Sequence, residues 1–96
     1  KNMSEESQLE QLIEQTINGA VTTIPAHIQE IEANKDTLKV ADTKEFVYGL
    51  VMGMTLGMAS ALLTSMKRGI PTPEDQLMIR DLVYKKIPEI RKRIFQ

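Results

Sequence analysis

His27 and Glu30 are the residues whose types and spacing come closest to a reactive pair. They lie three positions apart, so they share one face if this segment is helical, and together they offer two metal ligands or an acid and a base. A transition-metal site normally takes more ligands than this pair supplies, and the chain has one histidine and no cysteine. We therefore predict a protein without metal, cofactor or enzymatic activity, in which His27 is exposed or caps a helix.

A basic cluster near the C-terminus is the best candidate for an anion- or nucleic-acid-binding surface. Phosphates attract such clusters whatever the base sequence. Asp81 and Glu89 interrupt the cluster, and the whole chain carries a formal net charge of −1. A solvated helix face is therefore the favoured interpretation, with nucleic-acid binding as the alternative. The cluster consists of Arg80, Lys85, Lys86, Arg91, Lys92 and Arg93.

Small residues recur at every fourth position along the central segment. We call this line the small-residue ridge; it consists of Gly49, Gly53, Gly57, Ala61 and Ser65. On a helix these residues form one line along which another backbone can approach closely. An interior glycine costs a helix about 1 kcal/mol relative to alanine, so we expect close packing to return that energy.

The ridge admits three interpretations. The segment from Phe46 to Met66 has no charged residue and is long enough to cross a bilayer, which would make the chain a single-pass membrane component. Alternatively, the segment is the buried spine of one bundle, with the ridge against a helix of the same chain. In the third interpretation the ridge meets its own copy across a two-fold axis. We favour the third, because few amphipathic neighbours are available to cover a helix that is apolar all round.

The central helix has clear signals at both ends. Asp42 followed by Glu45 predicts a reciprocal N-cap, in which each side chain accepts a hydrogen bond from an amide at the helix start. Lys67 and Arg68 suit the negative end of the helix, and Gly69 is expected to adopt the left-handed conformation that terminates it. The larger side chains expected to face other helices are Leu50, Met54, Leu56, Met58, Leu62 and Leu63.

An amphipathic first helix is predicted to start after Ser4, whose hydroxyl suits an N-cap. Pro25 lacks an amide donor and disfavours helical geometry at the preceding residue, so the helix should end or kink at Thr22 and Thr23, and we expect a break near Thr23. A short second helix around Ile28 should then end at residues 34–36. The apolar stripe of the first helix consists of Leu9, Leu12, Ile13, Thr16, Ile17, Ala20, Val21 and Ile24.

The last helical region is predicted to start at Pro73, with Thr72 as its N-cap. The short connection from Gly69 to Thr72 favours an antiparallel arrangement with the central helix. Pro88 should kink this last helix or split it. Its apolar stripe consists of Leu82, Val83, Ile87, Ile90 and Ile94.

Composition places the chain among small globular proteins. Of its 96 residues, 42% are hydrophobic and 26% charged, which is too apolar for a disordered chain and suits one domain over residues 1–96. Lys1 and Asn2 precede Met3 and are interpreted as additions to a native start. The six methionines suit an adaptable groove, or more commonly the filling of a core. We expect a cytoplasmic protein.

The sequence thus predicts an all-α bundle of three to five helices around a long central hydrophobic helix, assembled as a dimer. Its predicted function is that of a non-enzymatic interaction module, which self-associates through the small-residue ridge and presents polar helix faces to an unidentified protein partner. The alternatives are a nucleic-acid-binding accessory protein that uses the basic cluster, and a single-pass membrane component.

Overall fold

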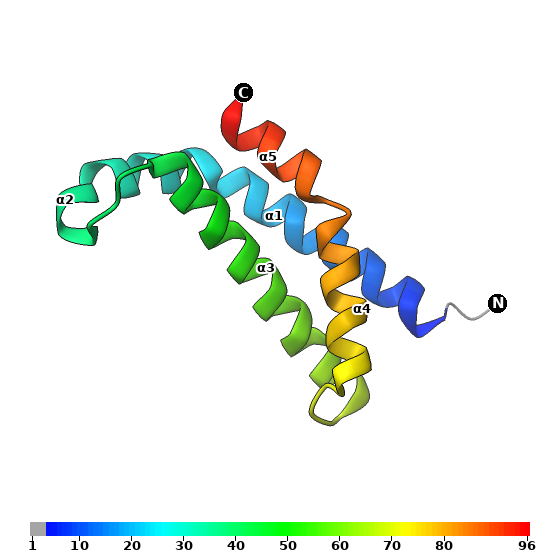
Figure 1. Ribbon diagram of the computed structural model, residues 1–96. Coiled ribbons are helices and arrows are strands. Elements are labelled where there is room, and N and C mark those ends of the chain that lie inside the picture. Colours follow the sequence, from blue (N-terminus) through cyan, green and yellow to red (C-terminus); the bar gives the residue numbers. More distant parts are fainter. Residues whose placement is uncertain (1–3) are drawn as a thin grey trace.

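The computed structural model describes residues 4–96, and over this range the chain forms five helices and no strand (Figure 1). The helices are α1 (Glu5–Ala33), α2 (Lys35–Leu38), α3 (Thr43–Lys67), α4 (Pro73–Tyr84) and α5 (Ile87–Phe95). The prediction of an all-α bundle around a long central helix is confirmed. The interpretation of Lys1 and Asn2 as additions lies outside the described residues.

The bundle has two layers. The long helices α1 and α3 pack side by side and run in opposite directions, while α4 and α5 fold back over one side of the pair (Figure 1). The molecule measures 49 × 25 × 17 Å along its principal axes. Because a helix with its side chains is about 10 Å across, the shortest dimension leaves room for two layers only. Among the residues that the structure describes, no helix covers the other side of the α1–α3 pair.

The core is organised around one row of α3. This buried row repeats every fourth residue and consists of Val47, Val51, Thr55, Ala59 and Leu63. Facing it are the buried side chains of the other helices, among them Leu9, Ile13, Ile17, Ile24, Ile79, Leu82, Val83, Ile90 and Ile94. The hydroxyl of Thr55 donates to the carbonyl oxygen of Val51 at 2.8 Å, so this polar group enters the core with its hydrogen bond satisfied.

Helix α1 continues through Pro25, so the predicted break near Thr23 is wrong. A proline inside a helix costs about 3 kcal/mol. The buried side chains of Ile24 and Ile31, on either side of Pro25, pack in the core and offset this cost. The hydroxyl of Thr23 donates to the carbonyl oxygen of Ala20 at 2.7 Å, a local bond of the kind that bends helices. Tertiary packing thus overrides the local signal.

The predicted short helix around Ile28 is also wrong, because this segment belongs to α1. Helix α1 ends at Ala33, and the backbone amide of its C-cap residue, Asn34, donates to the carbonyl oxygen of Ile31. A single further turn, α2, follows, and its C-cap residue, Lys39, adopts a left-handed conformation with φ of 61°. The connection between the two long helices is therefore built from one short turn.

The two ends of α3 follow the prediction in part. The carboxylate of Asp42 accepts a hydrogen bond from the amide of Glu45 at 3.1 Å, as expected for an N-cap. The carboxylate of Glu45, however, binds Arg91 of α5, so the cap is not reciprocal. At the other end the left-handed residue is Arg68, with φ of 56°, and not Gly69. The amide of Arg68 caps the helix through the carbonyl oxygen of Thr64.

Helices α4 and α5 begin and end close to where the sequence predicts. Thr72 and Asp75 form a complete capping box at the start of α4, with Pro73 as its first residue. Pro88 lies in the first turn of α5, where a backbone amide would have no acceptor within the helix, so the proline costs no hydrogen bond. The helical region is split just before it. The predicted split at Pro88 is confirmed.

Candidate interaction surface on α1 and α3

The small-residue ridge lies on the exposed side of α3. It follows the buried row by two residues, which corresponds to about 200° around a helix and therefore to the opposite face. All five ridge residues are exposed. Around each of its three glycines, no described residue other than the glycine's own helical neighbours has an atom within 4 Å of the position that a Cβ would take. The interpretation of the ridge as a contact within the chain is therefore wrong.

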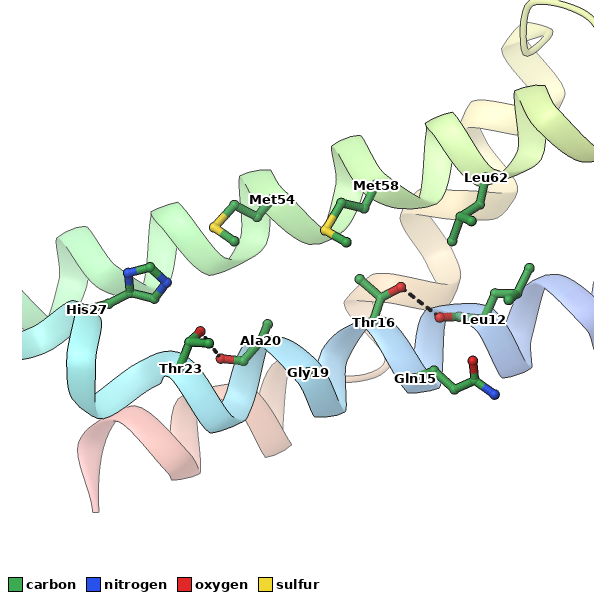
Figure 2. Close-up of a pocket in the computed structure, with 10 residues that line it drawn as sticks. All are labelled: Leu12, Gln15, Thr16, Gly19, Ala20, Thr23, His27, Met54, Met58 and Leu62. Atoms are coloured by element: carbon green, nitrogen blue, oxygen red, sulfur yellow. Dashed lines mark hydrogen bonds between the residues drawn. The ribbon is translucent and has the colours of Figure 1, made fainter.

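An apolar groove runs beside the ridge, between α3 and α1. It has a volume of about 680 Å³, and Figure 2 shows Met54, Met58 and Leu62 of α3 projecting toward α1 across it. The α1 side is lined by Leu12, Gln15, Thr16, Gly19, Ala20, Thr23 and His27. Ridge and groove together form one surface, which we call the open face.

Two threonine side chains that line the groove have their hydroxyl groups hydrogen-bonded within α1. The hydroxyl of Thr16 donates to the carbonyl oxygen of Leu12 at 2.8 Å, and that of Thr23 donates within its own helix in the same way (Figure 2). Their hydrogen-bonding capacity is thus used locally, which leaves the methyl groups as contact surface. Gln15 and His27 are the remaining polar side chains of the lining.

Met54 and Met58 are more exposed than predicted. The sequence predicts that they face other helices, but they are 36% and 50% exposed. They project into the groove, on the side of the α1–α3 pair that α4 and α5 do not cover (Figure 2). Flexible thioethers adapt to irregular partners, so this exposed pair suits a surface that receives another apolar group.

The open face lacks charge along most of its length. Charged residues are absent from two segments, Gln15 to Gln29 in α1 and Phe46 to Met66 in α3. The structure places these two segments side by side. Depletion of charge at the centre of a surface is a compositional signature of protein interfaces. The interface predicted from the sequence does not include α1, although the uncharged run of this helix is a signal that indicates it.

The structure separates the environments of His27 and Glu30. His27 is half-buried and lines one end of the groove. Glu30 is exposed, and its carboxylate accepts a hydrogen bond from the side-chain amide of Asn34 at 3.0 Å. Among the side chains that the structure describes, no three of histidine, cysteine, aspartate or glutamate gather as a set of metal ligands.

Most of the predicted basic cluster is engaged in ion pairs within the bundle. Arg80 pairs with Asp81 in α4, whereas the other contacts join helices: Lys85 to Glu10, Lys86 to Glu14 and Arg91 to Glu45. The hydrogen bond from Lys86 to Glu14 raises the pKa of that lysine. Lys92 and Arg93 are exposed and form no ion pair with the described residues. The structure therefore does not leave the six cations available as one patch.

Helix α3 also satisfies the length and composition of a membrane span. The same helix carries the buried row that packs against α1, α4 and α5. A core helix of a soluble bundle passes the same test of length and apolarity, so length and composition alone do not separate the two.

The chain matches no protein-family model, and neither the curated proteins nor the solved structures give a significant match.

Proposed function

We propose that this chain is a non-enzymatic helical interaction module that self-associates through the open face. One observation carries the proposal. Gly49, Gly53 and Gly57 lie in the interior of α3, where each costs about 0.8 to 1 kcal/mol of helix stability relative to alanine. Packing among the described residues does not return this energy, because none of their helices meets these glycines. A backbone that approaches from outside would return it.

The composition of the open face supports the same proposal. The open face joins the ridge to the exposed methionines of the groove. The segments of α1 and α3 that form it, residues 15–29 and 46–66, contain no charged residue. Small residues permit close approach, while methionines fill the irregular space beside them. Leu77 and Tyr84 are exposed on α4, outside the open face, and would remain accessible to a further protein partner.

The two alternatives have less support. For nucleic-acid binding, Arg80, Lys85, Lys86 and Arg91 would have to leave the acidic side chains that pair with them. For a single-pass membrane protein, α3 would have to separate its buried row from the helices that cover it, exposing the apolar faces of α1, α4 and α5. The interaction module requires neither change.

The first test is the molar mass of the protein by light scattering in detergent-free buffer. We expect a dimer that dissociates on dilution. A soluble monomer at the highest accessible concentration would contradict the proposal, and a chain that stays in solution only with detergent would favour the membrane alternative.

The second test is Gly53→Leu. Because the Cβ position at Gly53 is vacant, leucine fits the isolated chain and raises helix propensity by about 0.8 kcal/mol. We expect the variant to be more stable than the wild type where both are monomeric, yet to associate more weakly. Gln76→Leu adds the same side chain at an exposed position of α4 and should leave association unchanged. A folded Gly53→Leu variant with the wild-type mass would rule out the ridge as the contact.

A further inference from the structure

We infer that the groove between α1 and α3 receives a second copy of this chain in antiparallel orientation, with the two-fold axis near Gly57 and Met54 and Met58 of each copy seated in the groove of the other. This inference rests on the proposed function and adds the orientation and the occupant of the groove. Four observations carry it: the exposed area, the position of the groove, the gradient of side-chain size along the ridge and the spacing of the ridge.

The accessible surface indicates a missing partner of protein size. A folded monomer of 10.8 kDa exposes about 5,500 Å² by the scaling of surface with mass, whereas this chain exposes 6348 Å². The excess is at most about 800 Å², because the total also counts residues 1–3, and this upper value is close to what one partner contributes to an interface of standard size. A small ligand in the groove would cover far less of this area.

The groove and the ridge are centred at the same level of α3. The three residues that line the groove from α3 are Met54, Met58 and Leu62, and their midpoint is adjacent to Gly57, the midpoint of the ridge. A two-fold contact must use the same patch on both copies. In a dimer with its two-fold axis at Gly57, each copy therefore covers the groove of the other. The methionines of one copy then lie opposite the Gly19 region of the other.

The sizes of the ridge residues favour the antiparallel orientation. Side chains grow along the ridge, from the glycines at its start to Ala61 and then Ser65. In an antiparallel pair centred on Gly57, Gly53 meets Ala61 on both sides of the axis, so the gap between the backbones is the same on either side of the crossing point. In a parallel pair the largest residues meet each other and the gap becomes a wedge. Even spacing retains more van der Waals contact.

The spacing of the ridge indicates how far such a contact extends. The small-residue ridge repeats every fourth residue, and two rows of this interval interdigitate when helices cross at about −50°. The methionine row repeats at the same interval. A partner packed in this way touches α3 near the crossing point, between Gly53 and Ala61, and the helix ends diverge. The ends of α3 are therefore not part of the predicted contact.

Cysteine crosslinking tests the orientation directly, because the chain contains no cysteine. Gly57→Cys should form a disulfide-linked dimer under mild oxidation. Gly53→Cys should not crosslink to itself, because an antiparallel contact offsets the two positions by eight residues, about 12 Å, and a disulfide needs Cα atoms within about 7 Å. Gly53→Cys mixed with Ala61→Cys should give a dimer that contains one copy of each. Leu77→Cys, exposed on α4, is the control that should remain unlinked.

Gly19→Leu tests the groove separately from the ridge. Gly19 lines the groove from α1, and its Cβ position is vacant, so leucine fits the isolated chain while narrowing the groove. We expect loss of the dimer at concentrations where the wild type is dimeric, with an unchanged helical spectrum. Retention of the wild-type mass by this variant would overturn the placement of the partner's methionines.

The outcomes separate the inference from the proposed function. A dimer in which Gly53→Cys crosslinks to itself would overturn the antiparallel orientation and leave self-association intact. A dimer in which neither Gly57→Cys nor the mixed pair crosslinks would overturn the inferred axis. A wild-type protein that remains monomeric would overturn both, and would return the groove to the status of an unfilled apolar surface.

Discussion

Arg91 of α5 forms a bidentate contact with the carboxylate of Glu45, in the first turn of α3. Nη2 of Arg91 donates to Oε2 of Glu45 at 2.9 Å, and Nη1 donates to Oε1 at 3.3 Å. The same guanidinium stacks 4.6 Å from the ring centroid of Tyr48 and 4.5 Å from that of Phe95. The bond to Glu45 raises the pKa of Arg91. This contact fastens the C-terminal helix to the start of the central helix.

Arg91→Lys should weaken this attachment although it keeps the positive charge. A lysine offers neither the planar fork that binds both carboxylate oxygens nor the flat surface that stacks on rings. We expect the melting temperature to fall by roughly 2 to 5 °C, as a modest exposed contact implies. Arg93→Lys, at an exposed position of the same helix, is the control and should melt with the wild type. Equal melting of all three proteins would argue against a stabilising role for the contact.

Asp75 should make the stability of the bundle depend on acid pH. The backbone amide of Thr72 donates to its carboxylate at 2.9 Å, and the Lys67 ammonium lies 3.1 Å away. These contacts, the amide first, lower the pKa of Asp75 in the folded chain. A carboxyl group with a lowered pKa in the folded chain stabilises the fold at pH values above its pKa in the unfolded chain, which is about 4. This stabilisation is lost as the pH falls through the pKa of the folded chain.

Urea unfolding of the wild type and of Asp75→Asn at several pH values measures this contribution. We expect the variant to be less stable at neutral pH and the difference between the two proteins to shrink below about pH 4. Asp81→Asn removes an exposed carboxylate of the same helix and serves as the control. A difference that stays constant down to pH 2 would show that the Asp75 carboxylate does not titrate as proposed.

Thr55→Val should be tolerated in spite of its position at the centre of the core. The hydroxyl of Thr55 bonds only within α3, to the carbonyl oxygen of Val51, and valine has the same shape. Removal of the hydroxyl therefore leaves no buried donor unpaired, and we expect a change in unfolding free energy within about 1 kcal/mol. Leu63→Ala, in the same row, should cost about 2 to 5 kcal/mol because it opens a cavity. A loss of similar size in both variants would point to another role for the hydroxyl.

Pro25→Ala should stabilise the chain. Alanine restores an amide donor in the middle of α1 and has the highest helix propensity, while the position itself is exposed. We expect an increase in unfolding free energy of about 1 to 3 kcal/mol. Alanine at the exposed position Gln29 should have a much smaller effect. A destabilised Pro25→Ala variant would show that Ile24 and Ile31 reach the core only because the proline bends α1.

The signals that the sequence conveys reliably are the local ones. Thr72 and Pro73 predict the start of α4 because the N-cap bond lies within one turn of the chain, and Asp42 predicts the start of α3 for the same reason. Pro88 predicts the split before α5 on local grounds as well. These features need no knowledge of what the helices pack against.

The features that were mispredicted depend on distant contacts. Pro25 does not end α1, because core packing on both sides of it outweighs its local cost. Glu45 does not complete the cap of α3, because Arg91, 46 residues later in the chain, binds its carboxylate instead. The spacing of the small residues predicts which residues form the ridge, but not whether the ridge faces the core or the solvent. That depends on which side of α3 is covered by α4 and α5, which is a property of the whole bundle.

The buried row and the small-residue ridge of α3 repeat at the same interval, two positions out of phase. An insertion of one residue after Thr55 would turn the remainder of the helix by about 100°. It would move Leu63 out of the core and Ala61 out of the ridge in the same step. An insertion of four residues would keep both lines within about 40° of their present course. Changes in the length of α3 are thus restricted to whole turns, because its inner and outer surfaces share a single phase.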